Sequence, residues 1–83
     1  MDILALSPNP AHETTSLVLR STQEATLTIK TVDLLGRIVL EEAIEIKEGH
    51  NFINLDLKEL ATGAYILHIG DGIIWRTIRF VKS

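Results

Sequence analysis

The chain lacks several features that would narrow its function. It has no cysteine among its 83 residues, so neither a disulfide framework nor a thiolate metal site is possible. Its aromatic residues are one Trp, one Tyr and two Phe, while Leu, Ile and Val are abundant, which favours an aliphatic sandwich core over an aromatic ligand platform. A net charge of −3 disfavours nucleic acid and anionic membranes as partners, since both attract clustered Lys and Arg.

Long apolar segments are also missing. No run reaches the ~18–20 apolar residues of a membrane helix, and no secretory leader pattern precedes the first polar turn, so we expect no direct membrane insertion. The length corresponds to one domain near the lower limit for a core without disulfides or metal. Strand-like sequence follows Met1 at once, which suggests that the chain begins within a longer protein.

The region from residue 25 to residue 43 is the clearest hairpin in the chain. Apolar and polar residues alternate from Ala25 to Thr31, as in a strand with one buried face. In the loop that follows, Asp33 can accept backbone N–H bonds and Gly36 can adopt positive φ, so a type I turn followed by a left-handed residue fits. Ile38 and Leu40 are expected to share a face on the returning strand.

Similar alternation predicts the other strands. The predicted ranges are Ser16–Arg20, Ile38–Ile46, Asn51–Leu57, Tyr65–Ile69 and a final strand that begins at Ile73, with Met1–Leu6 as a possible edge strand. Turns are expected at Lys47–Gly49, Lys58–Gly63 and Gly70–Gly72. No ten-residue segment has helical periodicity. The pattern therefore predicts an all-β fold, an Ig-like antiparallel β-sandwich of about seven strands.

Some residues conflict with the alternation. Glu42 has the parity of apolar neighbours, so we expect a bulge near it or an early exit of the strand from the core. Arg76 interrupts the final strand and is expected to snorkel or to mark a bulge. Leu34 and Leu35 lie at the hairpin tip and are expected to fold back over the open end of the sandwich, although they could instead stay exposed as a docking knob.

Candidate catalytic and metal-binding groups do not converge. His12, His50 and His68 have no ligand spacing, and the glutamates between residues 41 and 48 are typical of a solvated edge strand. The aspartates lie at turns, where bonds to local backbone account for them. We therefore predict no catalytic residue, no metal and no cofactor.

Five turn and strand signals occur in a characteristic order. They are Ser7-Pro8-Asn9-Pro10-Ala11, the run from Val32 to Val39, Gly49-His50-Asn51, the run from Leu60 to Tyr65, and Arg79-Phe80-Val81-Lys82. Together they resemble the type A C-terminal sorting domain of the type IX secretion system, over nearly the whole chain. The resemblance implies an Ig-like sandwich that directs an attached upstream cargo from the periplasm across the outer membrane, to the cell surface or the medium.

The resemblance also implies partners and positions. The partners would be the translocon, its outer-membrane shuttle protein and a cell-surface sortase, which removes the domain and supplies the chemistry. Residues 1–6 would be the end of the cargo linker or an edge strand, and residues 7–83 the sorting domain. The candidate recognition positions are Pro8, Asn9, Pro10, Asp33, Gly36, Arg37, Gly63, Tyr65, Arg79, Phe80, Val81 and Lys82.

Another reading of the sequence remains open. Trp75 and Tyr65 are compatible with a fibronectin-like or carbohydrate-binding sandwich module appended to a secreted hydrolase, in which aromatic rings stack on sugars. For Trp75, a simple covering role on the outer face of a sheet is the other interpretation. Weak pairing of two copies through an edge strand is also possible in either case.

Overall fold

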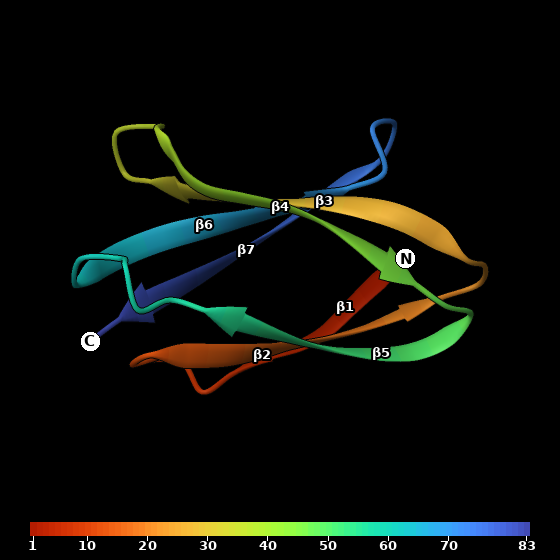
Figure 1. Cartoon of the computed structure of the whole chain (residues 1–83), viewed down its shortest axis with the longest axis horizontal. Helices are drawn as coiled ribbons and strands as arrows, with labels where there is room; N and C mark the ends of the chain where they lie inside the picture. Colours follow the sequence, from red (N-terminus) through yellow and green to blue (C-terminus); the bar gives the residue numbers. More distant parts are fainter.

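The chain folds into seven antiparallel strands in two sheets, with no helix, which confirms the predicted β-sandwich (Figure 1). The computed structural model describes all residues from Met1 to Ser83. The strands are β1 (Asp2–Ser7), β2 (Thr14–Ser21), β3 (Ala25–Asp33), β4 (Ile38–Ile46), β5 (Gly49–Asp56), β6 (Gly63–Gly70) and β7 (Trp75–Lys82). No helix is present that could cross a lipid bilayer.

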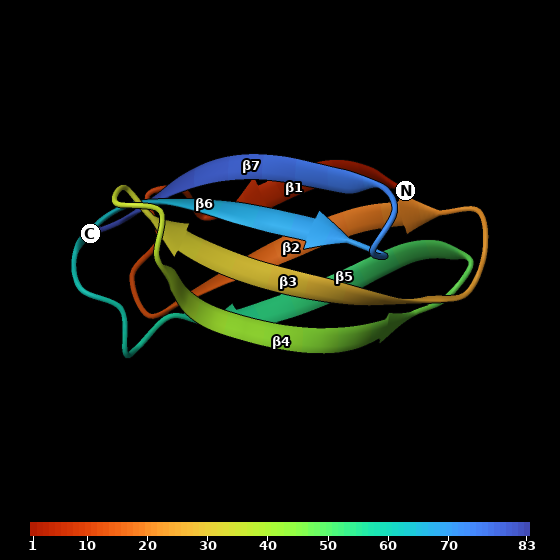
Figure 2. The same cartoon turned by 90° about the horizontal axis from the view of Figure 1, so that it is seen from above.

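The two sheets have the strand orders β1-β2-β5 and β4-β3-β6-β7 (Figure 2). Hairpins join β3 to β4 and β6 to β7, while the chain crosses between sheets after β2, β4 and β5. In a constant-type immunoglobulin domain the fourth strand pairs with the fifth, whereas here it pairs with the third. The fold is otherwise Ig-like, and the predicted central position of β6 is confirmed.

The core between the sheets is aliphatic, as the composition predicts. Alternate residues of β2 and β3 point inward, including Leu17, Leu19, Leu27 and Ile29, and they form one cluster with the inner residues of β6. Two-residue alternation places every second side chain on one face of a strand, so each strand contributes its apolar set to the same layer. The interior holds few aromatic rings, and Phe80 is the largest fully buried side chain.

Each edge strand of the four-stranded sheet has a charged residue at a position on the core-facing side. These two positions lie in the same row of paired residues across the sheet. Glu42 of β4 pairs with Ile29, which pairs with Ile69 of β6, which pairs with Arg76 of β7. The register is regular at both charged positions, so neither residue marks a bulge. The early exit from the core that was the other expectation for Glu42 is also wrong, because Ile46 beyond it is buried; for Arg76 the snorkelling alternative is left. Both side chains are exposed, although Leu40, Ile44 and Ile78 of the same edge strands pack against the core. Charges placed in this way oppose edge-to-edge association.

The bulge of this sheet lies elsewhere, at Val39. Thr31 pairs with Leu40 and Val32 pairs with Ile38, so Val39 is the extra residue on β4. One extra residue reverses the side-chain alternation, and Ile38 therefore faces outward while Leu40 faces inward. The expectation that Ile38 and Leu40 share a face is wrong.

The final strand starts two residues later than predicted. Ile73 and Ile74 belong to the β6–β7 loop and are exposed, while β7 begins at Trp75. The cause is the side chain of Asp71, whose Oδ1 accepts bonds from the backbone N–H groups of Ile73 and Ile74 at 2.8 Å each. These bonds commit both amides to the loop, so they do not form a strand.

Candidate functional site

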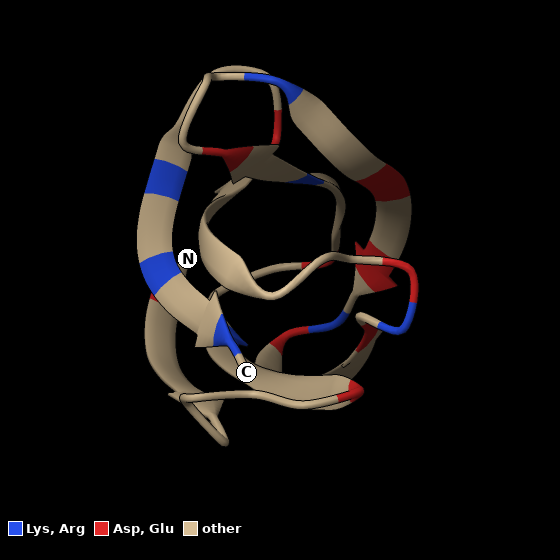
Figure 3. Ribbon diagram, turned by 90° about the vertical axis from the view of Figure 1, so that its left-hand side faces the viewer, with Lys and Arg blue, Asp and Glu red and all other residues tan.

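Four of the five sequence signals lie together at one end of the sandwich. Strand pairing aligns Asp33 with Tyr65, Tyr65 with Phe80, and Gly63 with Lys82. Figure 1 shows the β3–β4 loop, the start of β6 and the C-terminus at this left-hand end, and Figure 3 shows the end facing the viewer. The Pro8–Pro10 turn joins them through Ala11, which bridges to Lys82. We call this region the motif end.

The β3–β4 loop is held by the side chain of Asp33, as predicted. Its Oδ1 accepts bonds from the backbone N–H groups of Leu35 and Arg37, both at 2.9 Å, and its Oδ2 accepts one from Arg37 Nε at 2.8 Å. The backbone adds a bond from Gly36 N to Asp33 O at 3.0 Å, and Gly36 has the predicted positive φ, 84°. The backbone N–H of Arg37 is the largest cause that lowers the pKa of Asp33 below its usual value.

The two leucines of this loop are exposed, contrary to the expectation that they fold back over the core. Leu34 is 71% exposed and Leu35 is 79% exposed. The bonds that the Asp33 carboxylate accepts fix the loop as a continuation of the hairpin, so the leucine side chains cannot reach the core. The docking-knob alternative describes their position correctly.

The turn at Pro8–Pro10 is attached to the last strand. Asn9 Oδ1 accepts the backbone N–H of Val81 at 3.0 Å, and Asn9 Nδ2 donates to the carbonyl of Arg79 at 3.5 Å. The carbonyl of Pro8 accepts a bond from Thr15 Oγ1 at 3.0 Å, which holds the turn on β2. Both X-Pro bonds are cis. The Asn9 side chain thus bonds to backbone groups on the edge of β7 that faces away from β6.

Ala11 extends this attachment to the end of the chain. Its N–H donates to the carbonyl of Val81 at 2.7 Å, and its carbonyl accepts the N–H of Ser83 at 2.8 Å. Ala11 is fully buried. The terminal residues are therefore bonded to β6 on one side and to residues 9–11 on the other. Sequence reasoning included Ala11 in a motif but did not assign it this role, because the pairing joins segments 70 residues apart.

Tyr65 and Phe80 form the aromatic centre of the motif end. Their rings stack with centroids 5.5 Å apart, and Tyr65 Oη donates to the carbonyl of Ala61 at 2.5 Å. A tyrosine near the start of this strand that bonds back to the preceding corner is a hallmark of Ig-like sandwiches. Lys82 Nζ donates to the carbonyl of Leu60 at 2.6 Å in the same connection. These contacts of Tyr65, Phe80 and Lys82 hold the last strand in place.

Trp75 has the covering role. It lies beside Gly70 on the outer face of the four-stranded sheet, where a Cβ added to Gly70 would lie 2.3 Å from the indole Cδ2. Lys30 Nζ is 5.1 Å from the ring centroid, and the side chain is 38% exposed. Tyr65 is buried at the other end of the sheet. The two aromatic residues therefore form no common platform, which leaves the carbohydrate-binding alternative without support.

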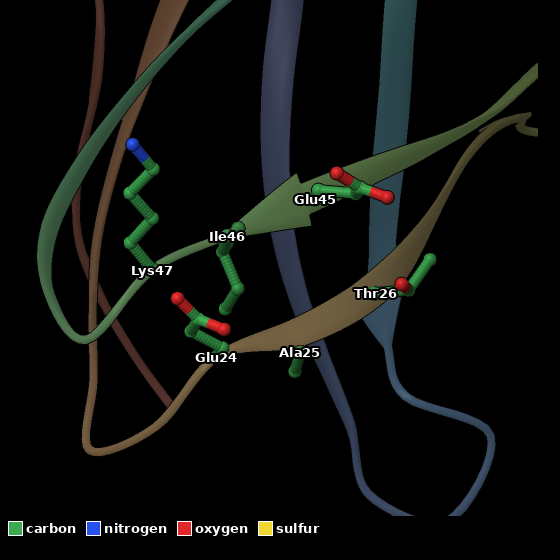
Figure 4. A pocket seen from close by; sticks show the side chains of 6 residues that line it. All are labelled: Glu24, Ala25, Thr26, Glu45, Ile46 and Lys47. Atoms are coloured by element: carbon green, nitrogen blue, oxygen red, sulfur yellow. The ribbon is translucent and has the colours of Figure 1, made fainter.

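A cleft lies away from the motif end. It has a volume of about 460 Å³ and is lined by Glu24, Ala25, Thr26, Glu45, Ile46 and Lys47, where β3 begins and β4 ends (Figure 4). None of the candidate recognition positions lines it. Its carboxylates and lysine stand at an open, solvated rim, and no three acidic or imidazole side chains are grouped as metal ligands in the structure.

The histidines stay apart from one another. His50 lies on β5 and His68 on β6, in different sheets. His12 Nδ1 is 3.0 Å from Ser83 Oγ, and both residues are exposed beside the end of the chain. A nucleophilic serine needs a histidine that is itself oriented by a third group, and none is bonded to His12.

Comparison with known families gives one result. Residues 5–83 match the family described as the secretion system C-terminal sorting domain, which covers nearly the whole chain. No curated protein shows significant similarity to the sequence.

Proposed function

We infer that this chain, which belongs to the family of type IX secretion C-terminal sorting domains, presents its sorting signal as a folded surface at the motif end. The chain is a C-terminal sorting signal for that pathway. It serves to export an upstream cargo to the cell surface or out of the cell, together with the type IX machinery.

The observation that carries the proposal is the convergence of distant segments. Residues 8–11, 33–37, 63–65 and 79–82 lie far apart in sequence, with 72 positions between Asn9 and Val81, but bond or pair with one another in the fold. An unfolded tail cannot present these segments together. A receptor that reads them as one surface would therefore select folded domains.

The recognition positions divide by exposure. Phe80 is 1% exposed and Tyr65 is also buried, so both act through the fold. The side chains of Arg37, Arg79 and Val81 are exposed and available to a partner. We propose that Pro8, Asn9, Pro10, Gly63, Tyr65, Phe80 and Lys82 hold the last strand, and that Asp33 and Gly36 shape the hairpin. We propose that the side chains of Arg37, Arg79 and Val81, to which we assign no such role, make contact.

The partners we propose are the translocon, its outer-membrane shuttle protein and a cell-surface sortase. The domain would meet them after passage into the periplasm. Domains of this family are not known as catalysts, and we propose that this chain likewise acts by binding alone while the sortase cuts. Because β1 pairs with β2 from Asp2 to Ser7, a cut that leaves the sandwich intact would lie before Asp2, upstream of the proposed sorting domain at residues 7–83.

Export of a reporter tests the proposal. A reporter with an amino-terminal export signal and residues 1–83 at its carboxy terminus should reach the surface or medium in a host with type IX secretion, and stay in the periplasm of a translocon-deficient host. Equal export of the reporter without the domain would contradict the proposal.

The last strand needs a separate design, because deletion of Phe80–Ser83 would also remove a core side chain. Arg79→Ala and Val81→Ser change exposed side chains only. We expect both variants to keep the thermal midpoint and to reduce export. Normal export of both would exclude the exposed face of β7 from recognition.

Pairing of two copies through an edge strand is a further proposal, and β5 supports it best. Unlike β4 and β7, β5 carries no charged residue among its first seven residues, and its register with β2 has no bulge. Phe52 is exposed on its outer face. Sedimentation at increasing concentration should reveal weak dimers that Phe52→Lys abolishes; a monomer at all concentrations would reject the idea.

A further inference from the structure

The hairpin tip continues into an apolar area on the outer face of the four-stranded sheet. Leu34, Leu35, Ile38 and Val39 are the exposed large hydrophobic residues at the β3–β4 hairpin. Ile38 pairs with Val32, and Val32 pairs with Ile66, both half-buried on the same outer face. We call these six residues the apolar patch. Contiguous exposed apolar surface of this kind marks an interaction site in many proteins.

Hydrogen bonds in the loop and the bulge on β4 keep the apolar patch exposed. The loop that carries Leu34 and Leu35 is closed by three bonds that the Asp33 carboxylate accepts and by two backbone bonds between Asp33, Gly36 and Arg37. The bulge at Val39 turns Ile38 outward, away from the core. A partner would therefore meet leucines on a loop backbone that is already ordered, which reduces the entropy lost on binding.

Arg79 is the cation beside the patch that is not paired with a carboxylate. The side chain of Arg37 is 70% exposed at the tip, and Arg79 pairs with Ile66 at the other side of the patch. The Asp33 carboxylate accepts a bond from Arg37 Nε at 2.8 Å within the loop, so these two charges offset each other. Figure 3 shows the basic residues along β7, which borders this face, and the acidic residues along β4. The nearest glutamate on this face, Glu41, lies one row further on and pairs with Lys30.

We propose that the apolar patch docks into an apolar pocket with an acidic rim on a protein of the type IX machinery, an inference that rests on the proposed function. Leu34 and Leu35 enter the pocket, and Arg79 meets its carboxylates. A lipid surface is the less suitable occupant because three glutamates follow on β4 and the net charge is −3, so an anionic bilayer would repel the rest of the domain.

The test replaces the leucines in the reporter fusion. Leu34→Ser with Leu35→Ser should reduce export at least tenfold and leave the thermal midpoint of the isolated chain unchanged, because neither side chain contacts the core. Leu34→Met with Leu35→Met should retain export. The matched control is Ile73→Ser, which removes an 89% exposed apolar side chain from an Asp-fixed loop outside the patch and should export normally.

Two further arms test the charge and the lipid alternative. Arg79→Glu should reduce export, whereas Lys47→Glu, an equal reversal on an exposed side chain outside the patch, should not. Vesicles of phosphatidylethanolamine and phosphatidylglycerol should not bind the isolated chain. Vesicle binding that disappears in the double serine variant would overturn the proposal in favour of a membrane contact.

The outcomes also separate this inference from the function on which it rests. Export by the unchanged domain together with equal export by the double serine variant overturns the patch alone. Failure of the unchanged domain to export the reporter overturns both.

Discussion

Substitution of Gly70 by alanine tests how Trp75 packs on the outer face of the sheet. A Cβ at this position would lie 2.3 Å from Trp75 Cδ2, 2.5 Å from its Cε3 and 2.8 Å from the carbonyl oxygen of Ile74. Gly70 does not have positive φ, so the backbone itself accepts alanine. The cost therefore comes from the space that the indole and the Ile74 carbonyl occupy.

The expected magnitude follows from two opposed contributions. Forcing an extra methyl group into occupied space costs about 1–3 kcal/mol, while replacing a strand glycine by alanine gains about 0.5–1 kcal/mol in backbone entropy. The difference is a net loss of about 0–2.5 kcal/mol. Because three contacts fall below 3.0 Å, we expect the upper part of this range, about 1–2.5 kcal/mol, which lowers the melting temperature by roughly 5–20 °C for a domain of this size. The indole should move away from Gly70, and its fluorescence should shift to longer wavelength.

A double-mutant cycle identifies the cause. In a Trp75→Ala background, Gly70→Ala should cost less, because two of the three close contacts are gone and only the Ile74 carbonyl remains. Thermal unfolding of the four proteins gives the coupling energy. An equal cost in both backgrounds would refute the packing of Trp75 on Gly70, and it would reopen the possibility of a ring free to bind a ligand.

Other predictions concern the motif end. Phe80→Ala should lower the free energy of unfolding by about 3–5 kcal/mol, in a domain whose total free energy of unfolding is about 4–12 kcal/mol. A urea midpoint that falls by less than a tenth would contradict the core role of Phe80. Asn9→Ala should cost about 1–2 kcal/mol for two bonds and speed hydrogen exchange of the Val81 amide, and unchanged exchange would count against the attachment. Asp33, whose pKa is lowered, stabilises the fold above the unfolded value of about 3.9, and this contribution disappears as the pH falls through the folded pKa. A carboxyl titration by NMR should therefore give Asp33 a pKa below that of an unfolded aspartate, and an ordinary pKa would contradict the loop bonds.

The strands and the hairpin turn could be predicted because their causes are local. Alternation from Ala25 to Thr31 and from Asn51 to Leu57 identifies the buried face of each strand directly. The functions of Asp33 and Gly36 in the turn depend only on residues within four positions of them. Sequence chemistry is sufficient where both partners of an interaction are neighbours in the chain.

The errors arose where the cause is a pairing between segments. The outward turn of Ile38 depends on the bulge at Val39, which exists only relative to β3. The exposure of Glu42 and Arg76 depends on their strands being the sheet edges, and strand order cannot be obtained from periodicity. The late start of β7 could have been predicted from the sequence, because an aspartate between two glycines is well suited to accept bonds from the backbone N–H groups that follow it.

The site itself was only partly accessible from the sequence. The resemblance identified the segments, but not that Asn9 and Ala11 bind the edge of β7 or that Lys82 reaches the carbonyl of Leu60. The role of Tyr65 could have been predicted, because a tyrosine at the start of the sixth strand of a seven-stranded sandwich is where a tyrosine corner occurs.

We infer that the type IX machinery recognises the sorting signal in its folded state. The most direct measurement is the export yield of the reporter carrying Phe80→Ala, compared with the protease-resistant fraction of the same domain in a translocon-deficient host. Phe80 is buried, so this substitution changes folding without changing the exposed surface. We predict that export falls in proportion to the folded fraction; full export from a domain that protease degrades would contradict the claim.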